Sequence, residues 1–138
     1  MVVDESLPLY PIRTDIYTEA LLSSERIQEY IHSFEEIVYD QEYFRDKKVN
    51  LSGIAEKMDI STQYLTQILS RTYEMGLPEI INRLRVKYAC SLLLKNPESS
   101  MAEIAESSGF SSESTFFRNF KNFTNMTPAQ FRTYKPSI

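Results

Sequence analysis

The sequence is poor in the residue types from which disulfides, metal sites and phosphate-binding loops are built. Its 138 residues include one cysteine (Cys90), one histidine (His32), three glycines and no tryptophan. A single cysteine cannot form an intrachain disulfide, and no Cys/His spacing suits a metal ion. The glycines stand too far apart for a phosphate loop. We therefore expect no metal and no cofactor, in a reducing, cytoplasmic setting.

Catalytic and membrane-spanning features are equally scarce. Neither the Cys90 thiol nor the His32 imidazole has a partner close in sequence, so we predict that the chain is not an enzyme. We interpret Cys90 as a buried helix residue and His32 as an exposed structural one. No apolar run approaches the ~20 residues needed to cross a bilayer, and no signal-peptide pattern opens the chain. We expect no membrane contact by this segment.

The formal net charge of −4 argues at face value against a polyanionic partner, because nucleic-acid-binding domains are usually basic. The charge is unevenly distributed along the chain. Residues 1–50 carry eleven Asp or Glu against five Lys or Arg, a net of −6, whereas residues 51–138 carry eight against ten, a net of +2. The C-terminal part is therefore the basic part, although its excess is modest.

What the sequence does have is helical periodicity, with no pattern typical of a strand. Residues 1–23 contain two prolines and are predicted to be a lead-in or linker. Residues 24–44 are predicted to form a helical preamble, because apolar side chains recur there at helical spacing. This apolar stripe comprises Ile27, Tyr30, Ile31, Phe34 and Ile37. Residues 45–138 are predicted to form the main domain.

Two stretches of the main domain resemble each other: LSGIAEKMDISTQYLTQIL, which begins at Leu51, and MAEIAESSGFSSESTFFRNF, which begins at Met101. The pairs that match at a spacing of fifty residues are Ile54/Ile104, Ala55/Ala105, Glu56/Glu106 and Ser61/Ser111. Two units of a short helix, a tight turn and a second helix are typical of a tandem helix-turn-helix protein. We therefore expect an all-α fold with two such lobes.

Capping residues predict where these helices begin and end. Residues suited to the N-cap position are Asn50, Ser61, Ser100, Ser112 and Thr127. Glu103 and Gln130 complete capping boxes, and Gly109 suits a turn with positive φ. A long helix from Pro78 to Lys95 is predicted to join the two lobes.

The second helix of each unit is predicted to present polar side chains to the major groove, which is ~12 Å wide. Because Leu65, Ile68 and Leu69 are predicted to face inward, the outward residues of the first helix are Thr62, Gln63, Thr66, Gln67 and Arg71. The corresponding set in the second unit is Ser112, Glu113, Ser114, Phe117, Arg118, Lys121 and Asn122. Glutamine can contact adenine, and Arg118 can contact guanine, each with two hydrogen bonds.

The joining helix has a length suited to two such readers. Eighteen residues from Pro78 to Lys95 span roughly 27 Å at ~1.5 Å each. Successive major-groove segments on one DNA face lie ~34 Å apart. We expect one monomeric domain to read two successive grooves, at an asymmetric site, because the two outward sets differ.

Several motifs together resemble the AraC/XylS family of bacterial transcription regulators. They are L-x-x-I-A with S-x-x-Y-L in the first unit, I-I-N-R-L-R-V-x-x-A-x-x-L-L in the joining helix, and I-A-E-S-S-G-F followed by F-F-R-N-F-K-N-F-T-N-M-T-P-A-Q-F-R within 104–132. The resemblance covers about residues 45–134. It implies seven helices and sequence-specific binding to promoter DNA, usually for activation. It also implies RNA polymerase as a partner and an upstream sensor domain that this chain does not include.

Carried over by this resemblance, the base-facing residues are Gln63, Thr66 and Gln67, then Glu113, Ser114, Phe117 and Arg118. The chain departs from the family pattern where Asp59, Glu74 and Asn125 replace glycines. Glutamate tolerates left-handed backbone poorly, so Gly76 is expected to supply the positive φ that follows the first recognition helix.

A second interpretation stays open at the level of sequence. The acidic isoelectric point and the small positive excess of the repeat region also suit an all-α protein-interaction domain of the same fold with little affinity for DNA. The dependence of binding on salt separates the two, because phosphate contacts release counterions.

Overall fold

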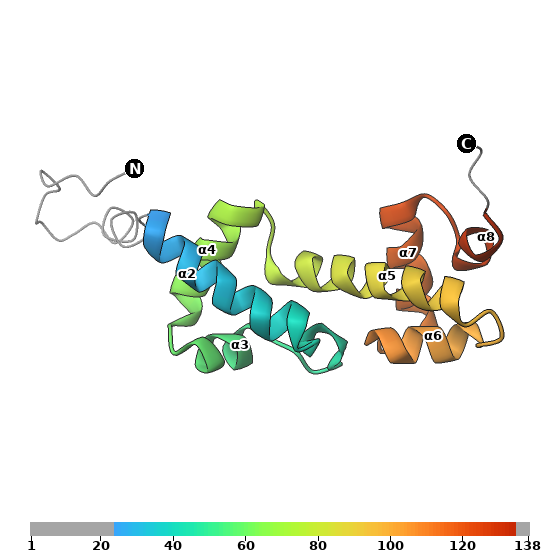
Figure 1. Cartoon of the computed structure of the whole chain (residues 1–138), viewed down its shortest axis with the longest axis horizontal. Helices are drawn as coiled ribbons and strands as arrows, with labels where there is room; N and C mark the ends of the chain where they lie inside the picture. The colour runs from blue at the N-terminus through green and yellow to red at the C-terminus, as the bar shows by residue number, and fades with distance from the viewer. Residues whose placement is uncertain (1–23, 135–138) are drawn as a thin grey trace, which may run out of the picture. The chain divides into compact units, whose positions relative to one another are not determined.

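The computed structural model describes residues 24–134, and these divide into two compact units (Figure 1). Within the described range, the first unit comprises residues 24–41 and 50–77, and the second comprises residues 42–49 and 78–134. The predicted lead-in at residues 1–23 lies outside the described residues. The predicted domain boundary at residue 45 stays a prediction.

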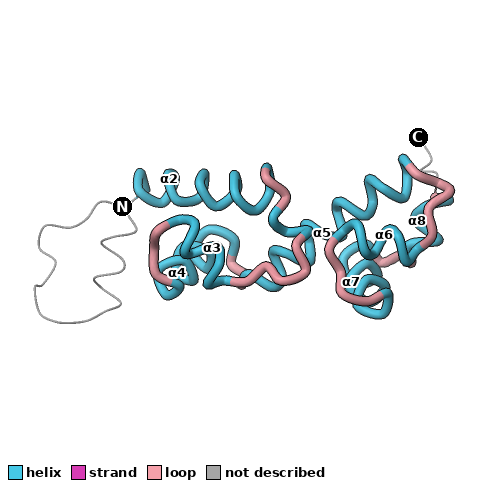
Figure 2. The backbone as a smooth tube through the Cα atoms, turned by 90° about the horizontal axis from the view of Figure 1, so that it is seen from below, coloured by secondary structure: helices cyan, strands magenta, loops and turns pink. Residues whose placement is uncertain are grey.

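The all-α expectation is confirmed, since residues 24–134 contain seven α-helices and no strand (Figure 2). A π-helix and a 3₁₀ helix follow the first of them. In chain order the elements are α2 (Ser24–Glu35), η1 (Glu36–Asp40), η2 (Tyr43–Arg45), α3 (Leu51–Met58), α4 (Thr62–Tyr73), α5 (Leu77–Lys95), α6 (Met101–Ser108), α7 (Glu113–Thr124) and α8 (Pro128–Thr133). Helix α5 is the predicted joining helix.

The first unit is built from α2, α3 and α4. Helix α2 lies alongside the other two (Figures 1 and 2). The side chains that it and η1 bury are Phe34 and Val38, and those buried on α3 and α4 include Ile54 and Leu65. Burial of each large apolar side chain contributes roughly 1.5–3 kcal/mol, so α2 stabilises the helix pair against which it packs.

The predicted preamble helix ends differently from expectation. Its last turn is a π-helix, in which the backbone N–H of Gln41 donates to the carbonyl of Glu36 at 2.9 Å. This wider turn buries Val38 completely, whereas the predicted Ile37 stays half-buried. Glu42 follows in the left-handed region, with a φ of 59°, and ends the helix.

The second unit is built around α5, α6, α7 and α8. Its buried apolar cluster comprises Val86, Ala89, Leu93, Ile104, Ala105, Phe110, Phe116 and Phe120. Arg132 on α8 closes the cluster by donating to the carbonyls of Asn96 (3.1 Å) and Ser99 (3.0 Å), which lie in the loop after α5. Three phenylalanines and five aliphatic residues thus form the core of the second helix-turn-helix.

The predicted N-caps are confirmed. The side chains of Asn50, Ser61, Ser100, Ser112 and Thr127 each accept a hydrogen bond from a backbone N–H in the first turn of the following helix. Both capping boxes are present, with Glu103 and Gln130 accepting from the N-cap backbone. These side chains satisfy N–H groups that have no partner within the helix.

An aromatic pair and a hydrogen bond hold α2 against the two ends of α4. The ring of Tyr30 meets the ring of Tyr64 edge-on, with their centroids 5.3 Å apart. At the other end, the Tyr73 hydroxyl donates to Glu35 Oε2 at 2.7 Å. Burial, and then this bond to a carboxylate, raise the pKa of Tyr73 far above its ordinary value.

This raised pKa predicts that the first unit loses stability in alkali. Above about pH 10 the unfolded chain loses the Tyr73 proton while the folded chain keeps it, so the free energy of unfolding falls as pH rises. Tyr73→Phe should remove this part of the decline. Thermal unfolding followed by circular dichroism between pH 8 and 11 measures it, with Tyr39→Phe, at an exposed ring, as the control. An equal decline in wild type and Tyr73→Phe would contradict the assignment.

Candidate nucleic-acid interface

Helix α4 has one buried face and one polar exposed face. Leu65, Ile68 and Leu69 are almost completely buried, which fixes the rotation of the helix about its own axis. The predicted outward residues are all exposed: Thr62, Gln63, Thr66, Gln67 and Arg71. No hydrogen bond within residues 24–134 engages the side-chain amides of Gln63 or Gln67. Their donors and acceptors are therefore available to a partner.

Helix α7 repeats this arrangement with aromatic anchors. Phe116 and Phe120 are completely buried and meet edge-on, with ring centroids 5.7 Å apart. The predicted outward residues are again all exposed: Ser112, Glu113, Ser114, Phe117, Arg118, Lys121 and Asn122. The two faces agree with the sequence prediction in exposure, and their role in DNA contact stays a prediction.

Two of the predicted contact residues already use their hydroxyl groups locally. Thr66 donates to the carbonyl of Thr62 at 2.9 Å, one turn earlier on α4. Ser112 caps α7, accepting from the Thr115 backbone N–H at 3.1 Å and donating to the Thr115 hydroxyl at 3.0 Å. The hydroxyl hydrogens of both residues are therefore already engaged in local hydrogen bonds.

Phe117 is the unusual member of the α7 face. Its ring is 40% exposed although it lies beside the buried ring of Phe116, with centroids 5.5 Å apart. An apolar side chain among polar ones suits contact with the thymine methyl group in a major groove. Arg118, the next residue, is exposed and has no polar partner among the described residues, so its guanidinium donors are available to a partner.

Left-handed residues end four helices of the two lobes and set the direction in which the chain leaves each one. They are Asp59 (φ 60°), Glu74 (φ 58°), Gly109 (φ 104°) and Asn125 (φ 62°). The expectation that Gly76 supplies the positive φ after α4 is wrong, because Glu74 adopts it directly. The Glu74 backbone N–H donates to the carbonyl of Ser70 at 3.0 Å, and this bond offsets part of the strain.

A segment that spans the predicted boundary between the preamble and the main domain belongs to the second unit. Residues 42–49 precede the first lobe in the chain but pack within the second unit. Arg45 donates to the carbonyl of Ser107, and Arg85 donates to the carbonyl of Phe44, each at 2.7 Å. Burial lowers the pKa of Arg85, and the nearby Asp46 opposes this effect. The pair Tyr43-Phe44, among charged residues, is the sequence signal of burial here.

Residues 24–134 contain no group of three His, Cys, Asp or Glu side chains placed to hold a metal ion. Within the same range, no helix combines the length and apolar character that crossing a membrane requires. Cys90 is half-buried on α5, and burial raises the pKa of its thiol, which disfavours the reactive thiolate.

The fold and the two faces define a tandem helix-turn-helix domain, and comparison with known proteins identifies its family. A family model described as a helix-turn-helix domain matches residues 54–134. The chain belongs to the AraC-type family, whose members are DNA-binding domains of bacterial transcription regulators and not enzymes.

Individual relatives agree with this assignment. The chain is 34% identical over 110 residues to the Msm operon regulatory protein of Streptococcus mutans, an alignment that covers 80% of this chain and 38% of that protein. It is 32% identical over 90 residues to an uncharacterized HTH-type transcriptional regulator of Staphylococcus aureus, covering 65% of this chain and 12% of that protein. The chain therefore spans less than half the length of these relatives.

A solved structure shows the same fold. The C-terminal domain of the two-component response regulator yesN from Fusobacterium nucleatum superposes with a TM-score of 0.68 at 29% identity, covering 75% of this chain and 98% of that one. The C-terminal domain of AraT, a response regulator from Geobacillus stearothermophilus, gives a TM-score of 0.64 at 27% identity, covering 84% and 90%.

The left-handed Glu74 predicts a stabilising substitution. Glycine adopts this conformation without a Cβ penalty, so Glu74→Gly should raise the free energy of unfolding by about 0.5–1 kcal/mol. Urea titration measures the midpoint. The matched control is Glu56→Gly, at an exposed position inside α3, which should lower stability by about 1 kcal/mol. A lower midpoint for both variants would show that the backbone at Glu74 is not strained.

Proposed function

We propose that this domain binds a specific double-stranded promoter sequence by placing α4 and α7 in successive major grooves, and that it belongs to a transcription activator. The observation that carries the proposal is the shared construction of the two helices. Each is capped at its start, anchored by buried residues and exposed along a polar outer face. A protein-interaction domain would not need the same polar face twice.

The length of α5 supports binding of the domain to two adjacent major grooves. Its 19 residues extend roughly 28 Å at ~1.5 Å each, close to the ~34 Å repeat of the major groove along one face of DNA. The face of α4 offers mainly amides and hydroxyls, whereas that of α7 offers Arg118, Lys121 and the ring of Phe117. The two half-elements of the site should therefore differ in sequence.

The charges of the two units support unequal roles. Among the described residues, the second unit carries ten Lys or Arg against seven Asp or Glu, a net of +3, and the first carries three against eight, a net of −5. Attraction to phosphate is then concentrated in the second unit. We propose that α7 and its surroundings supply most of the salt-dependent affinity, and that α4 contributes mainly sequence preference.

The remaining parts of the proposal follow from the relatives. The matched regulators are much longer than this chain, and two solved neighbours are C-terminal domains of response regulators. We propose that an upstream sensor domain controls this DNA-binding domain. The regulator bound to promoter DNA would contact RNA polymerase, and it would act in the cytoplasm, where the chromosome lies.

Arg118 and Lys121 should affect binding in different ways. Arg118→Ala should weaken binding to the specific site by about 1–3 kcal/mol and relax the preference at one base pair. Lys121→Ala, one turn later on the same exposed face, should weaken binding to all duplexes alike and reduce the salt slope by about one unit. Dissociation constants on specific and random duplexes measure both. Equal losses of Arg118→Ala on the two duplexes would refute its role as a base reader.

Selection from a random duplex pool tests the whole proposal. Residues 1–138 should enrich an asymmetric site with two unlike half-elements about 10 bp apart, bound by one copy of the chain. The logarithm of the binding constant should fall steeply with the logarithm of salt, by about 0.9 per phosphate contacted. Recovery of a short palindrome bound by two copies would overturn the two-reader model. Absence of binding at low salt would favour the protein-interaction alternative.

A further inference from the structure

The segment Glu42–Val49, which we name the strap, packs on the second helix-turn-helix although it precedes the first in the chain. Phe44 anchors it. Its side chain is 3% exposed and its ring meets that of Tyr88 on α5 edge-on, with centroids 5.7 Å apart. A second contact lies at the surface, where Lys47 Nζ pairs with a Glu106 carboxylate oxygen at 2.6 Å.

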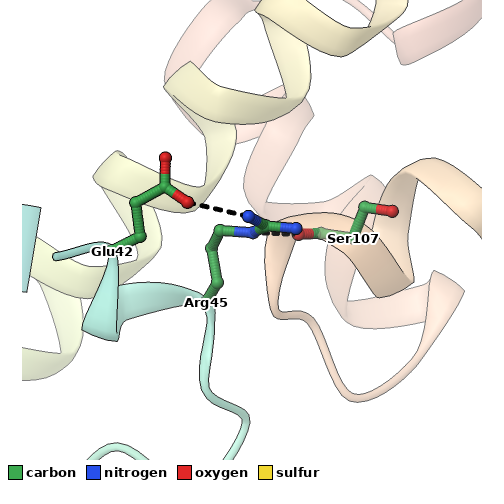
Figure 3. A network of polar contacts seen from close by, with 3 residues as sticks. All are labelled: Glu42, Arg45 and Ser107. Carbon is green, nitrogen blue, oxygen red and sulfur yellow. Dashed lines mark hydrogen bonds and ion pairs between the residues drawn. The ribbon is translucent and has the colours of Figure 1, made fainter.

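Arg45 joins the strap to the C-terminus of α6. Its Nε donates to the carbonyl oxygen of Ser107 at 2.7 Å, while another guanidinium nitrogen donates to Glu42 Oε1 at 2.8 Å (Figure 3). Ser107 lies in the last turn of α6, where carbonyls have no partner within the helix and the helix dipole favours a cation. The charged Arg45 side chain therefore satisfies a free carbonyl at the end of the helix where a positive charge is most favourable.

Arg85 holds the strap from the side of α5. Its Nε donates to the Phe44 carbonyl at 2.7 Å, and a second guanidinium nitrogen donates to the Asp46 carbonyl at 3.0 Å. Two backbone carbonyls of the strap are thus bonded to one side chain of the second unit. This pattern fixes the position of the strap backbone and not only of its side chains.

Gly109 shows how closely the strap approaches the turn between α6 and α7. A Cβ built on Gly109 would lie 2.9 Å from the Phe44 carbonyl oxygen, 2.9 Å from the Arg45 Cα and 2.8 Å from the Arg85 Nε. Two of these atoms belong to the strap backbone. The strap in its observed position and a side chain at residue 109 exclude each other.

The first helix-turn-helix lacks this constraint. Asp59 occupies the same left-handed position at the end of α3, with a side chain that is exposed, whereas Gly109 is buried. From Gly109 the chain reaches the cap of α7 in three residues. Phe110, which is 1% exposed, packs against Phe116 of α7 with centroids 5.4 Å apart. Fixing the turn therefore fixes where α7 begins and how it is rotated.

We propose that the strap is a positioning element for the second recognition helix, with Arg45 as its main positioning residue. Sequence discrimination by α7 then depends on residues that lie before the first lobe in the chain. This inference rests on the proposed function in so far as α7 reads DNA. That the strap holds the turn is a separate statement, which can be tested without DNA.

The variants are Arg45→Ala, Gly109→Ala and the milder Arg45→Lys, which keeps the charge but removes the Nε donor. Lys47→Ala is the control for charge, since it removes one cation from the same segment at an exposed ion pair. Asp59→Ala is the control for a left-handed alanine, placed in the first lobe.

The first measurement is amide hydrogen exchange of residues 110–115 in the DNA-free chain of 138 residues. Exchange should be about tenfold faster in Arg45→Ala and Gly109→Ala, with a smaller change in Arg45→Lys, and close to wild type in both controls. Wild-type exchange rates in Arg45→Ala and Gly109→Ala would overturn the proposal. Because this readout needs no DNA, it decides the role of the strap even if no duplex is selected from the pool.

The second measurement uses the duplex enriched from the random pool and two versions of it, each with one half-element scrambled. The half-element at which Arg118→Ala relaxes preference is assigned to α7. In Arg45→Ala the discrimination at that half-element should fall about tenfold, a loss comparable to that of one good base contact, while discrimination at the other half-element stays at the wild-type value. Equal losses at both half-elements in Arg45→Ala and Arg45→Lys would reduce the strap to a general stabilising contact and overturn the proposal.

Discussion

Short helices that end inside compact units must satisfy the backbone groups at their ends, and the arrangement of both lobes depends on this constraint. The side chains of Ser61 and Ser112 each accept from one backbone N–H in the first turn of α4 and α7. Left-handed residues turn the chain away at the other ends. Because each cap also fixes where its helix begins, the rotation of the polar faces follows from the same hydrogen bonds. Apolar burial of Leu65 and Phe116 then holds that rotation.

The two lobes meet this constraint in different ways. The turn before α4 uses an exposed Asp59, with local bonds only, whereas the turn before α7 uses a buried glycine under a segment from elsewhere in the chain. Three arginines of the second unit, Arg45, Arg85 and Arg132, donate to backbone carbonyls. These arginines therefore stabilise the fold of the second unit, and they also add to the positive potential that a polyanion would meet.

Much of the fold was predictable because its signals are local. Caps, capping boxes and apolar spacing act over only a few residues, so the starts of α4, α6 and α7 could be predicted from the sequence, as could the exposed polar faces. The prediction at Gly76 was wrong because Glu74 itself adopts the left-handed conformation, with a backbone hydrogen bond to Ser70 that offsets part of the strain. The π-helix after α2 was missed since its wider turn has no periodicity of its own in so short a segment.

The sequence by itself determined the helical class, the position of the caps and the chemical character of the two candidate reading faces. Only the tertiary structure decided that residues 42–49 belong with the second unit, because the bond from Arg45 to Ser107 joins residues 62 positions apart. The segment carries three Lys or Arg against two Asp or Glu, so its place in the second unit adds one positive charge there. Local patterns carry no information about a contact of this kind. The ring that packs on buried Phe44 belongs to Tyr88, and the carbonyl that accepts from Arg45 belongs to Ser107. Both lie far along the chain, so only folding brings them to the segment.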